Sequence, residues 1–213
     1  MFTTRTLLEG KWPILVMVAI SAATILGCPV GWAPIPPLIL LVFTISFFRD
    51  PKATVPADSQ LIVAPATGRI VEIKAVEEPR FLGGEATRVA IFLSVFDVHV
   101  QRAPISGTIK FVEYNQGRFL DARNPDASAQ NENRIVGIES SDGFRVTVRQ
   151  ISGLIARRIV GWAGQGATLA KGERFGMIRF GSRVELYVPT GTRIEAKVGD
   201  YAIGGETIIA RRI

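Results

Sequence analysis

The chain has 213 residues, a formal net charge of +6 at pH 7, one cysteine and one histidine. This length accommodates one well-buried domain plus an appendage. The single Cys28 excludes an intrachain disulfide and a cysteine-based metal site, and the single His99 excludes a multi-histidine metal site. Blocks of Lys or Arg alternating with aromatic residues are missing, which disfavours nucleic-acid binding; a mildly basic domain suits an anionic membrane surface better.

The first 48 residues predict a membrane anchor. No charged residue occurs between Trp12 and Phe48. A continuous helix of that length would extend about 55 Å, well beyond a bilayer core of about 30 Å. The segment GCPVGWAPIPP at 27–37 interrupts it with four prolines and two glycines. We therefore expect two short apolar helices, at roughly 12–28 and 35–48, that form a hairpin.

Positive residues flank both ends of this hairpin: Arg5 and Lys11 on one side, Arg49 and Lys52 on the other. By the positive-inside rule, both flanks lie on the cytoplasmic side and the Pro-rich turn lies across or within the membrane. A cleaved secretory signal peptide is the alternative interpretation. The apolar second segment and the charged exit FFRDP disfavour cleavage.

Residues 49–213 predict a domain that is mainly β. Short runs of strand-forming residues are separated by Gly, Pro, Asn and Asp, and no strong amphipathic helix is visible. The expected strands lie at 61–76, 88–101, 107–114, 134–140, 144–151, 156–162 and 182–189.

Two internal repeats indicate how these strands are arranged. APATGRI at 64–70 recurs as APISGTI at 103–109, and GATLAKGERFGMI at 166–178 recurs as GDYAIGGETIIA at 199–210. Repeats at this scale predict a compact, pseudo-symmetric β-sandwich, since a solenoid would need more copies. The Gly-Glu turns resemble those of barrel-sandwich domains such as biotinyl and lipoyl domains, a likeness of architecture only.

The segment NQGRFLDARNPDASAQNENR at 115–134 does not fit the strand pattern. Twenty mostly polar residues without periodicity are uncommon inside a compact domain and usually form a lid or a binding loop. Disorder is the alternative.

Two segments carry candidate chemistry. In FLSVFDVHVQRAP at 92–104, read as a strand, Asp97 and His99 share one face, about 7 Å apart, so both can line one pocket without an assured direct hydrogen bond. A structural histidine is the alternative. In RFGSRVELYVP at 179–189, Gly181 and Ser182 interrupt a half-buried strand whose apolar face is formed by Phe180, Val184, Leu186 and Val188. A bulge with a solvated serine would explain the glycine.

Together, the apolar hairpin, FDVHVQRAP, the NENR-containing loop and RFGSRVELYVP resemble the short bacterial type of phosphatidylserine decarboxylase proenzyme. The resemblance covers nearly the whole chain. It implies that the proenzyme cleaves itself between Gly181 and Ser182: Ser182 Oγ attacks the Gly181 carbonyl, and β-elimination followed by hydrolysis leaves a pyruvoyl group. The expected products are a β subunit, 1–181, and an α subunit, 182–213, which associate as a heterodimer.

The resemblance also implies the reaction. The pyruvoyl carbonyl forms a Schiff base with the amine of phosphatidylserine, accepts the electrons released with CO₂, and yields phosphatidylethanolamine. The group derived from Ser182 is then the only cofactor, without a metal or pyridoxal phosphate. We expect His99 to be the proton donor or base and Asp97 to orient it. Arg102 and Thr67 are the expected substrate-binding residues. Arg102 is expected to face the substrate phosphate or carboxylate, or else to form a surface salt bridge, and 115–134 is the candidate lid.

The expected setting follows from the same resemblance. The substrate is phosphatidylserine in the membrane, the location is the bacterial inner membrane, and the catalytic domain lies on the cytoplasmic side. A higher homo-oligomer is open, and no nucleic acid is expected.

The sequence departs from the family pattern at two positions. Family members with an Asp-His-Ser self-cleavage triad carry the Asp in a PADG-like motif, where this chain has PATG with Thr67. Long-type enzymes have a second His where this chain has Arg102. Either His99 serves both maturation and decarboxylation, assisted by Asp97 or Thr67, or self-cleavage is slow or impaired.

Three alternatives remain open. A membrane-anchored, non-enzymatic adaptor would need a long coiled-coil insertion, and none is visible; a lipoyl-type carrier would need a modifiable lysine in a context that Lys171 does not match. A pyruvoyl enzyme for a soluble amino acid would have no reason for the anchor. A family member that does not mature is made more plausible by Thr67.

Overall fold

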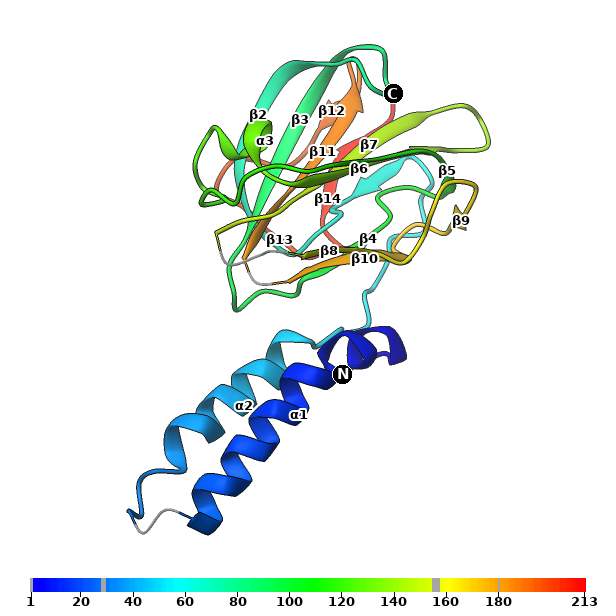
Figure 1. Cartoon of the computed structure of the whole chain (residues 1–213). Helices are drawn as coiled ribbons and strands as arrows, with labels where there is room; N and C mark the ends of the chain where they lie inside the picture. Colours follow the sequence, from blue (N-terminus) through cyan, green and yellow to red (C-terminus); the bar gives the residue numbers. More distant parts are fainter. Residues whose placement is uncertain (1, 28–29, 155–157, 180) are drawn as a thin grey trace. The chain divides into compact units, whose positions relative to one another are not determined.

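The computed structural model of the chain describes residues 2–27, 30–154, 158–179 and 181–213. It divides into two compact units, Met1–Lys52 and Ala53–Ile213 (Figure 1). The first unit is helical and the second is built mainly from strands.

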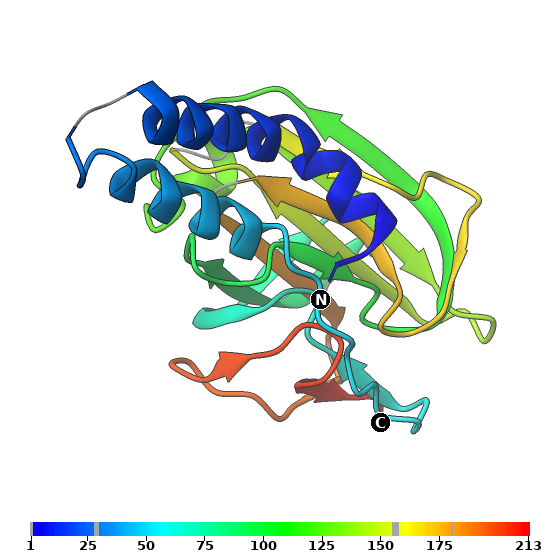
Figure 2. The ribbon, with the colours of Figure 1, turned by 90° about the horizontal axis from the view of Figure 1, so that it is seen from below.

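The N-terminal unit contains two helices, α1 (Thr4–Gly27) and α2 (Ile35–Phe47), which lie side by side (Figures 1 and 2). The helix α1 begins eight residues before the expected start, because nothing between Thr4 and Pro13 breaks a helix and charged side chains are tolerated on its exposed surface. Cys28, the expected last residue of this helix, lies outside the described residues. By length and composition α1 can cross a membrane, whereas the 13 residues of α2 extend only about 20 Å.

Within the described residues, the largest sheet of the second unit has eight strands in the order β13-β2-β3-β11-β7-β6-β5-β9, and every neighbouring pair is antiparallel. The strands are β2 (Gly68–Glu78), β3 (Gly84–Leu93), β5 (Gly107–Asn115), β6 (Asn133–Glu139), β7 (Arg145–Ile151), β9 (Thr168–Leu169), β11 (Ser182–Pro189) and β13 (Tyr201–Ala202).

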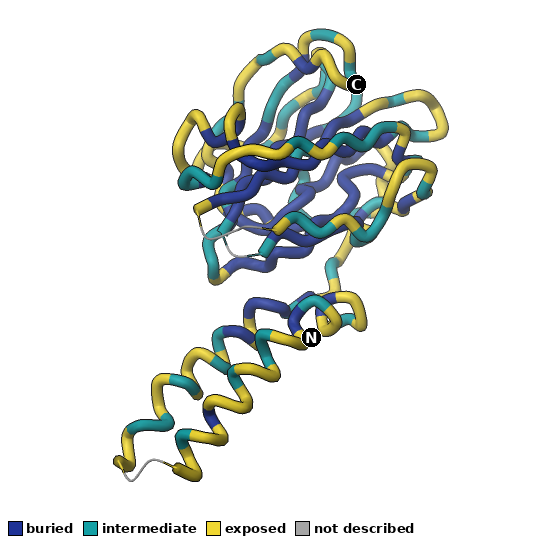
Figure 3. The backbone as a smooth tube through the Cα atoms, viewed as in Figure 1, coloured by how far each residue is buried: buried dark blue, intermediate teal, exposed yellow. Residues whose placement is uncertain are grey.

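Two three-stranded antiparallel sheets complete the domain, with the orders β1-β14-β12 and β4-β10-β8. Their strands are β1 (Leu61–Val63), β12 (Arg193–Ile194), β14 (Ile208–Arg211), β4 (Val100–Arg102), β8 (Arg158–Gly161) and β10 (Arg174–Arg179). One buried apolar cluster receives side chains from all three sheets, and Figure 3 shows it as the dark interior of the domain. The mainly β fold, preceded by an apolar helix, is confirmed.

The internal repeats occupy equivalent places, which gives the domain its pseudo-symmetry. The carbonyls of Ala64 and Ala103 each accept a hydrogen bond of 2.8 Å, from the N–H of Gly205 and Gly172, respectively. Both of these glycines have positive φ, +83° and +78°. Each copy therefore pairs the turn before a long strand with a glycine turn from the second repeat.

The predicted strands at 61–76 and 88–101 each prove to be two strands separated by a turn. The first is divided into β1 and β2, and the second into β3 and β4. The turns escape an alternation pattern because apolar residues such as Ala64, Ala66, Val95 and Val98 continue through them. The start of the predicted strand at 156–162 lies outside the described residues, as does Phe180.

Candidate functional site

The Gly181–Ser182 peptide lies where β11 enters the middle of the large sheet. Ser182 is the first residue of the strand, pairs with Leu93 of β3 and is fully buried. Gly181 has φ +67°, a left-handed conformation that residues with a side chain adopt at a cost. The glycine therefore turns the chain sharply just before the strand, rather than forming a bulge within it.

His99 contacts the backbone of Gly181 directly. The N–H of Gly181 donates to Nε2 of the fully buried imidazole at 3.1 Å, and Nδ1 lies 3.0 Å from the backbone carbonyl of Asp97. A carbonyl only accepts, so Nδ1 carries the proton, and the lone pair of Nε2 accepts the N–H of the residue that precedes Ser182. In this tautomer Nε2 carries no proton, as a general base requires.

A buried chain of amides fixes the backbone that carries this histidine. Gln101 Nε2 donates to the His99 carbonyl at 2.8 Å, and Gln150 Nε2 donates to Gln101 Oε1 at 2.8 Å. Arg134 Nη1 then donates to Gln150 Oε1 at 3.0 Å. Burial lowers the pKa of Arg134 below its ordinary value, because the charged form loses water. The chain links β4 to β7 and β6 across the core.

Ser182 Oγ is buried and has no hydrogen-bond partner among the described residues. Buried hydroxyls in folded proteins are nearly always paired, and leaving one unpaired costs about 1–3 kcal/mol. A buried, unpaired hydroxyl that directly follows a glycine bonded to a histidine is a candidate nucleophile rather than a structural serine. The bulge with a solvated Ser182, considered from the sequence, is therefore wrong.

The structure corrects the geometry predicted for Asp97. Residues 94–99 form a turn between β3 and β4, so Asp97 and His99 do not share the face of one strand. Asp97 Oδ2 instead accepts from the Ser94 N–H at 2.7 Å, and Oδ1 accepts from the Tyr201 hydroxyl at 2.6 Å. The aspartate reaches the imidazole through its backbone carbonyl, because its carboxylate is taken up by the turn.

Thr67 lies in the first of the two turns related by the internal repeat, and Arg102 ends β4 just before the second. Thr67 Oγ1 accepts from the Gly204 N–H at 3.0 Å, and Arg102 Nη1 donates to the Gly172 carbonyl at 3.1 Å. Both side chains are buried. These contacts give both residues a role in holding turns; a substrate contact for either one stays a prediction, and a surface salt bridge does not describe the buried Arg102.

A pocket of about 370 Å³ opens beside Gly181. It is lined by Phe92, Ser94, Val95, Asp121, Ala122, Arg123, Leu154 and Gly181. Phe92 and Val95, at the end of β3, form an apolar side of the pocket, and Asp121 and Arg123, from the segment 115–134, form a polar side. Arg123 pairs with Asp121 at 2.6 Å and holds the pKa of that carboxyl at about 2. The predicted lid segment therefore contributes part of the pocket wall.

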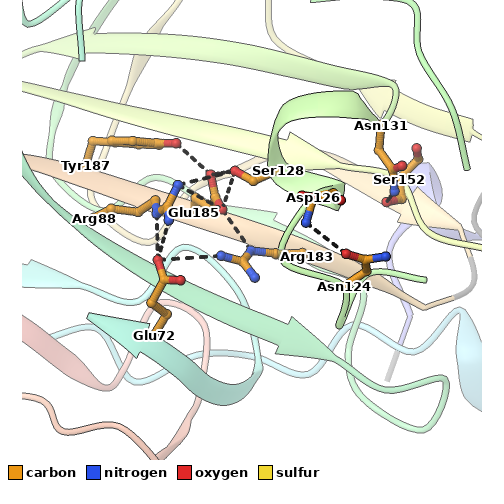
Figure 4. A network of polar contacts seen from close by, with 10 residues as sticks. All are labelled: Glu72, Arg88, Asn124, Asp126, Ser128, Asn131, Ser152, Arg183, Glu185 and Tyr187. Carbon is orange, nitrogen blue, oxygen red and sulfur yellow. Dashed lines mark hydrogen bonds and ion pairs between the residues drawn. The ribbon is translucent and has the colours of Figure 1, made fainter. Parts of the chain in front are cut away.

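The segment 115–134 is anchored by polar contacts. It contains a short helix, α3 (Ala127–Gln130), whose Ser128 Oγ donates to the buried Glu185 carboxylate at 2.8 Å (Figure 4). Asn131 Nδ2 donates to the carbonyls of Leu120 and Ser152, each at 2.9 Å. Its polar side chains therefore bond to the sheet, and disorder, the alternative interpretation of this segment, is wrong.

Glu185 is the centre of a charged cluster on the outer face of β11. The Glu185 carboxylate accepts a hydrogen bond from Arg183 Nε at 2.8 Å and another from the Tyr187 hydroxyl at 2.6 Å. The Arg88 side chain lies between the carboxylates of Glu185 and Glu72 (Figure 4). Burial, with the nearby Glu185 charge, raises the pKa of Tyr187 to about 12. Because α3 covers this cluster, β11 is buried on both faces rather than half-buried, as its alternation predicted.

Sequence reasoning missed several residues that shape the site. Gly153 lies so close to the Gly181–Ser182 peptide that a Cβ added to it would stand 2.5 Å from the Gly181 oxygen. Asn131 holds the neighbouring backbone at Ser152, and Gln150 holds the side chain of Gln101, both from within the core. The side-chain amides of Gln101 in β4 and Gln150 in β7 interrupt the apolar pattern of these strands. This interruption is the one sequence signal that could have identified them as buried polar residues.

Comparisons with known proteins place the chain in a family. The family model described as phosphatidylserine decarboxylase matches residues 40–210. A phosphatidylserine decarboxylase proenzyme of Symbiobacterium thermophilum is 43% identical over 204 residues, covering 95% of this chain and 94% of the relative. Proenzymes of the same name from Geobacter sp. (strain M21) and Burkholderia lata are 46% and 41% identical, covering 80% and 95% of this chain and 78% and 94% of their own lengths. The chain belongs to the phosphatidylserine decarboxylase family.

Proposed function

We propose that this protein decarboxylates phosphatidylserine to phosphatidylethanolamine, using a pyruvoyl group that it makes from its own Ser182. Family membership supports a decarboxylase. The observation that carries the finer proposal is the buried, unpaired Ser182 hydroxyl beside a glycine whose N–H is bonded to His99. The alternatives of a non-enzymatic adaptor or a carrier domain leave this arrangement without a purpose.

The residues around Ser182 fit a cofactor that is formed from this serine. Gly181 leaves its carbonyl open to approach, and the adjacent Gly153 offers no side chain that would obstruct it. When formed, the pyruvoyl group supplies an electron-accepting carbonyl for the electron pair left behind by CO₂.

Self-processing begins with Ser182. Its Oγ attacks the Gly181 carbonyl carbon, and His99 Nε2 takes the hydroxyl proton in place of the Gly181 N–H that it accepts in the resting chain. The Gly181–Ser182 C–N bond breaks as that proton passes to the leaving nitrogen. The product is an ester with a free amine. A base then takes the Ser182 Cα proton and the Ser182 Cβ–Oγ bond breaks, which frees the Gly181 carboxylate and leaves dehydroalanine. Water converts this to a ketone and ammonia, so each atom is accounted for.

The sheet keeps the two products together. The strand β11 pairs with β3 on one side and β7 on the other, and β14 pairs with β1. Residues 182–213 would therefore remain inserted in the domain after the bond breaks, which supports a heterodimer of 1–181 and 182–213.

The remaining groups suit a lipid substrate. The apolar pocket beside Gly181 can receive the part of the lipid next to its headgroup, with Arg123 as an exposed cation for phosphate or carboxylate. His99 is the acid–base group within reach of the reacting position, and such catalysis is worth about 10²–10⁴ in rate. The apolar α1 supports attachment to the bacterial inner membrane; the cytoplasmic side is proposed from the flanking positive residues.

The proposal is tested by CO₂ release from carboxyl-labelled phosphatidylserine in mixed micelles. We expect release by the wild-type chain and none by Ser182→Ala, which also stays a single chain. Ser141→Ala, at an exposed serine, is the matched control and should retain full activity. A Ser182→Ala protein as active as wild type would refute the proposal.

A further inference from the structure

A second unpaired, fully buried hydroxyl lies next to the scissile bond. Ser152 Oγ has no hydrogen-bond partner among the described residues. In the β11–β7 pairing Arg183 lies opposite Ile151, and continuing this register by one residue places Ser152 opposite Ser182. Directly opposed residues of an antiparallel pair have Cβ atoms about 4.5–5.5 Å apart on the same face of the sheet.

The backbone of Ser152 is held firmly, in contrast to its hydroxyl. Its N–H donates to the Glu132 carbonyl at 2.9 Å, and its carbonyl accepts from Asn131 Nδ2 at 2.9 Å (Figure 4). The next residue, Gly153, lies against the Gly181 oxygen, which confirms that the two strands continue in register. Ser152 is therefore fixed opposite the nucleophile by contacts that do not involve its own side chain.

A structural role does not explain this hydroxyl. Alanine would fill the same position without leaving a buried donor unpaired, so the serine is unfavourable for folding alone. Ser182 has the same defect at the facing position. The two unpaired hydroxyls belong to residues that lie opposite each other on neighbouring strands, next to the reactive peptide. This placement indicates that they interact during the reaction rather than in the resting chain.

We propose that Ser152 is a positioning residue for self-processing; the inference rests on the proposed function. As Ser182 Oγ turns toward the Gly181 carbonyl, the Ser152 hydroxyl donates a hydrogen bond to it. One Oγ lone pair is then occupied, the other is directed at the carbonyl carbon, and the Oγ proton goes to His99 Nε2. Ser152 itself forms and breaks no covalent bond.

The test follows the conversion of full-length chain to the 182–213 fragment after synthesis in membranes. Ser152→Ala removes the hydroxyl. Ser152→Thr and Ser152→Val have equal size and differ only in the hydroxyl, so comparing them separates the hydrogen bond from crowding. Thr147→Val is the matched control, since it removes a buried hydroxyl from the same strand that is bonded to Glu78 instead. Thermal unfolding is measured for every variant.

We expect processing of Ser152→Ala to slow about tenfold with an unchanged or higher unfolding temperature, as for the loss of one hydrogen bond. The Thr variant should process faster than the Val variant, and Thr147→Val at the wild-type rate. Hydroxylamine, which cleaves an ester, should not speed cleavage of Ser152→Ala, because the step before the ester is slowed.

Equal rates for Ser152→Ala and wild type, or for the Thr and Val variants, would overturn the role of Ser152 alone. Rapid cleavage of Ser152→Ala by hydroxylamine would also overturn it, since the ester would then be forming normally. A wild-type chain that never cleaves would overturn this inference together with the proposed function.

Discussion

Replacing Gly153 by alanine tests whether the backbone around the proposed cleavage site is as close-fitting as the structure indicates. The added Cβ would stand 2.5 Å from the Gly181 oxygen, whereas real Cβ contacts stay beyond 3.0 Å. The two strands must therefore separate by about 0.5 Å or more. Overpacking of this kind costs about 1–3 kcal/mol, and at about 2–4 °C per kcal/mol the unfolding temperature should fall by several degrees.

Processing should suffer more than stability does. A displacement of about 1 Å in a reacting group can cost about a hundredfold in rate, so we expect Gly153→Ala to slow cleavage about ten- to a hundredfold. The assay is the rate of appearance of the 182–213 fragment. Gly84→Ala is the control, because a Cβ there meets nothing within 4 Å. Processing of Gly153→Ala at the wild-type rate would refute the close approach of Gly153 to the reacting carbonyl.

Three further predictions concern the groups around β11. The pKa of Tyr187 is raised to about 12, whereas in the unfolded chain it is near 10. Its contribution to the free energy of unfolding, roughly 2–3 kcal/mol, is therefore complete below pH 10 and is lost as pH rises through 12. Urea unfolding measured across this pH range should show the decline, and Tyr187→Phe should reduce it. Ser128→Ala should lower the unfolding free energy by about 1.5–3 kcal/mol, since it removes a bond to a buried carboxylate; an unchanged value would argue against docking of α3 on Glu185. Asp97→Asn should lower the unfolding temperature but slow processing less than tenfold, because the contact with His99 is made by the backbone; abolished cleavage in a stable Asp97→Asn protein would contradict this.

The sequence contains enough information to select the candidate reacting groups but not to place them. Ser182 and His99 stand in recognisable motifs, and the repeats predicted the pseudo-symmetric β domain. The turn at 94–99 was missed because Val95, Phe96 and Val98 continue the apolar alternation of β3. Only the carboxylate of Asp97, bonded to the Ser94 N–H, reveals that the strand has ended.

The polar segment 115–134 shows the opposite limit. Its composition resembles that of a disordered loop, yet Ser128 and Asn131 are buried and bonded to the sheet. Their partners, Glu185 and the Ser152 carbonyl, are distant in sequence, and local pattern does not reveal such pairings. The position of Ser152 opposite Ser182 could not be predicted from the sequence either, because it depends on the register between β7 and β11.

The denaturing mass spectrum of the full chain after synthesis in membranes tests the central claim most directly. The account predicts two products, one ending at Gly181 and one beginning at position 182 whose mass is below that of the simple hydrolysis fragment, because its amine has become a ketone. A single uncut chain, or a 182–213 fragment with an ordinary serine amine, would contradict it.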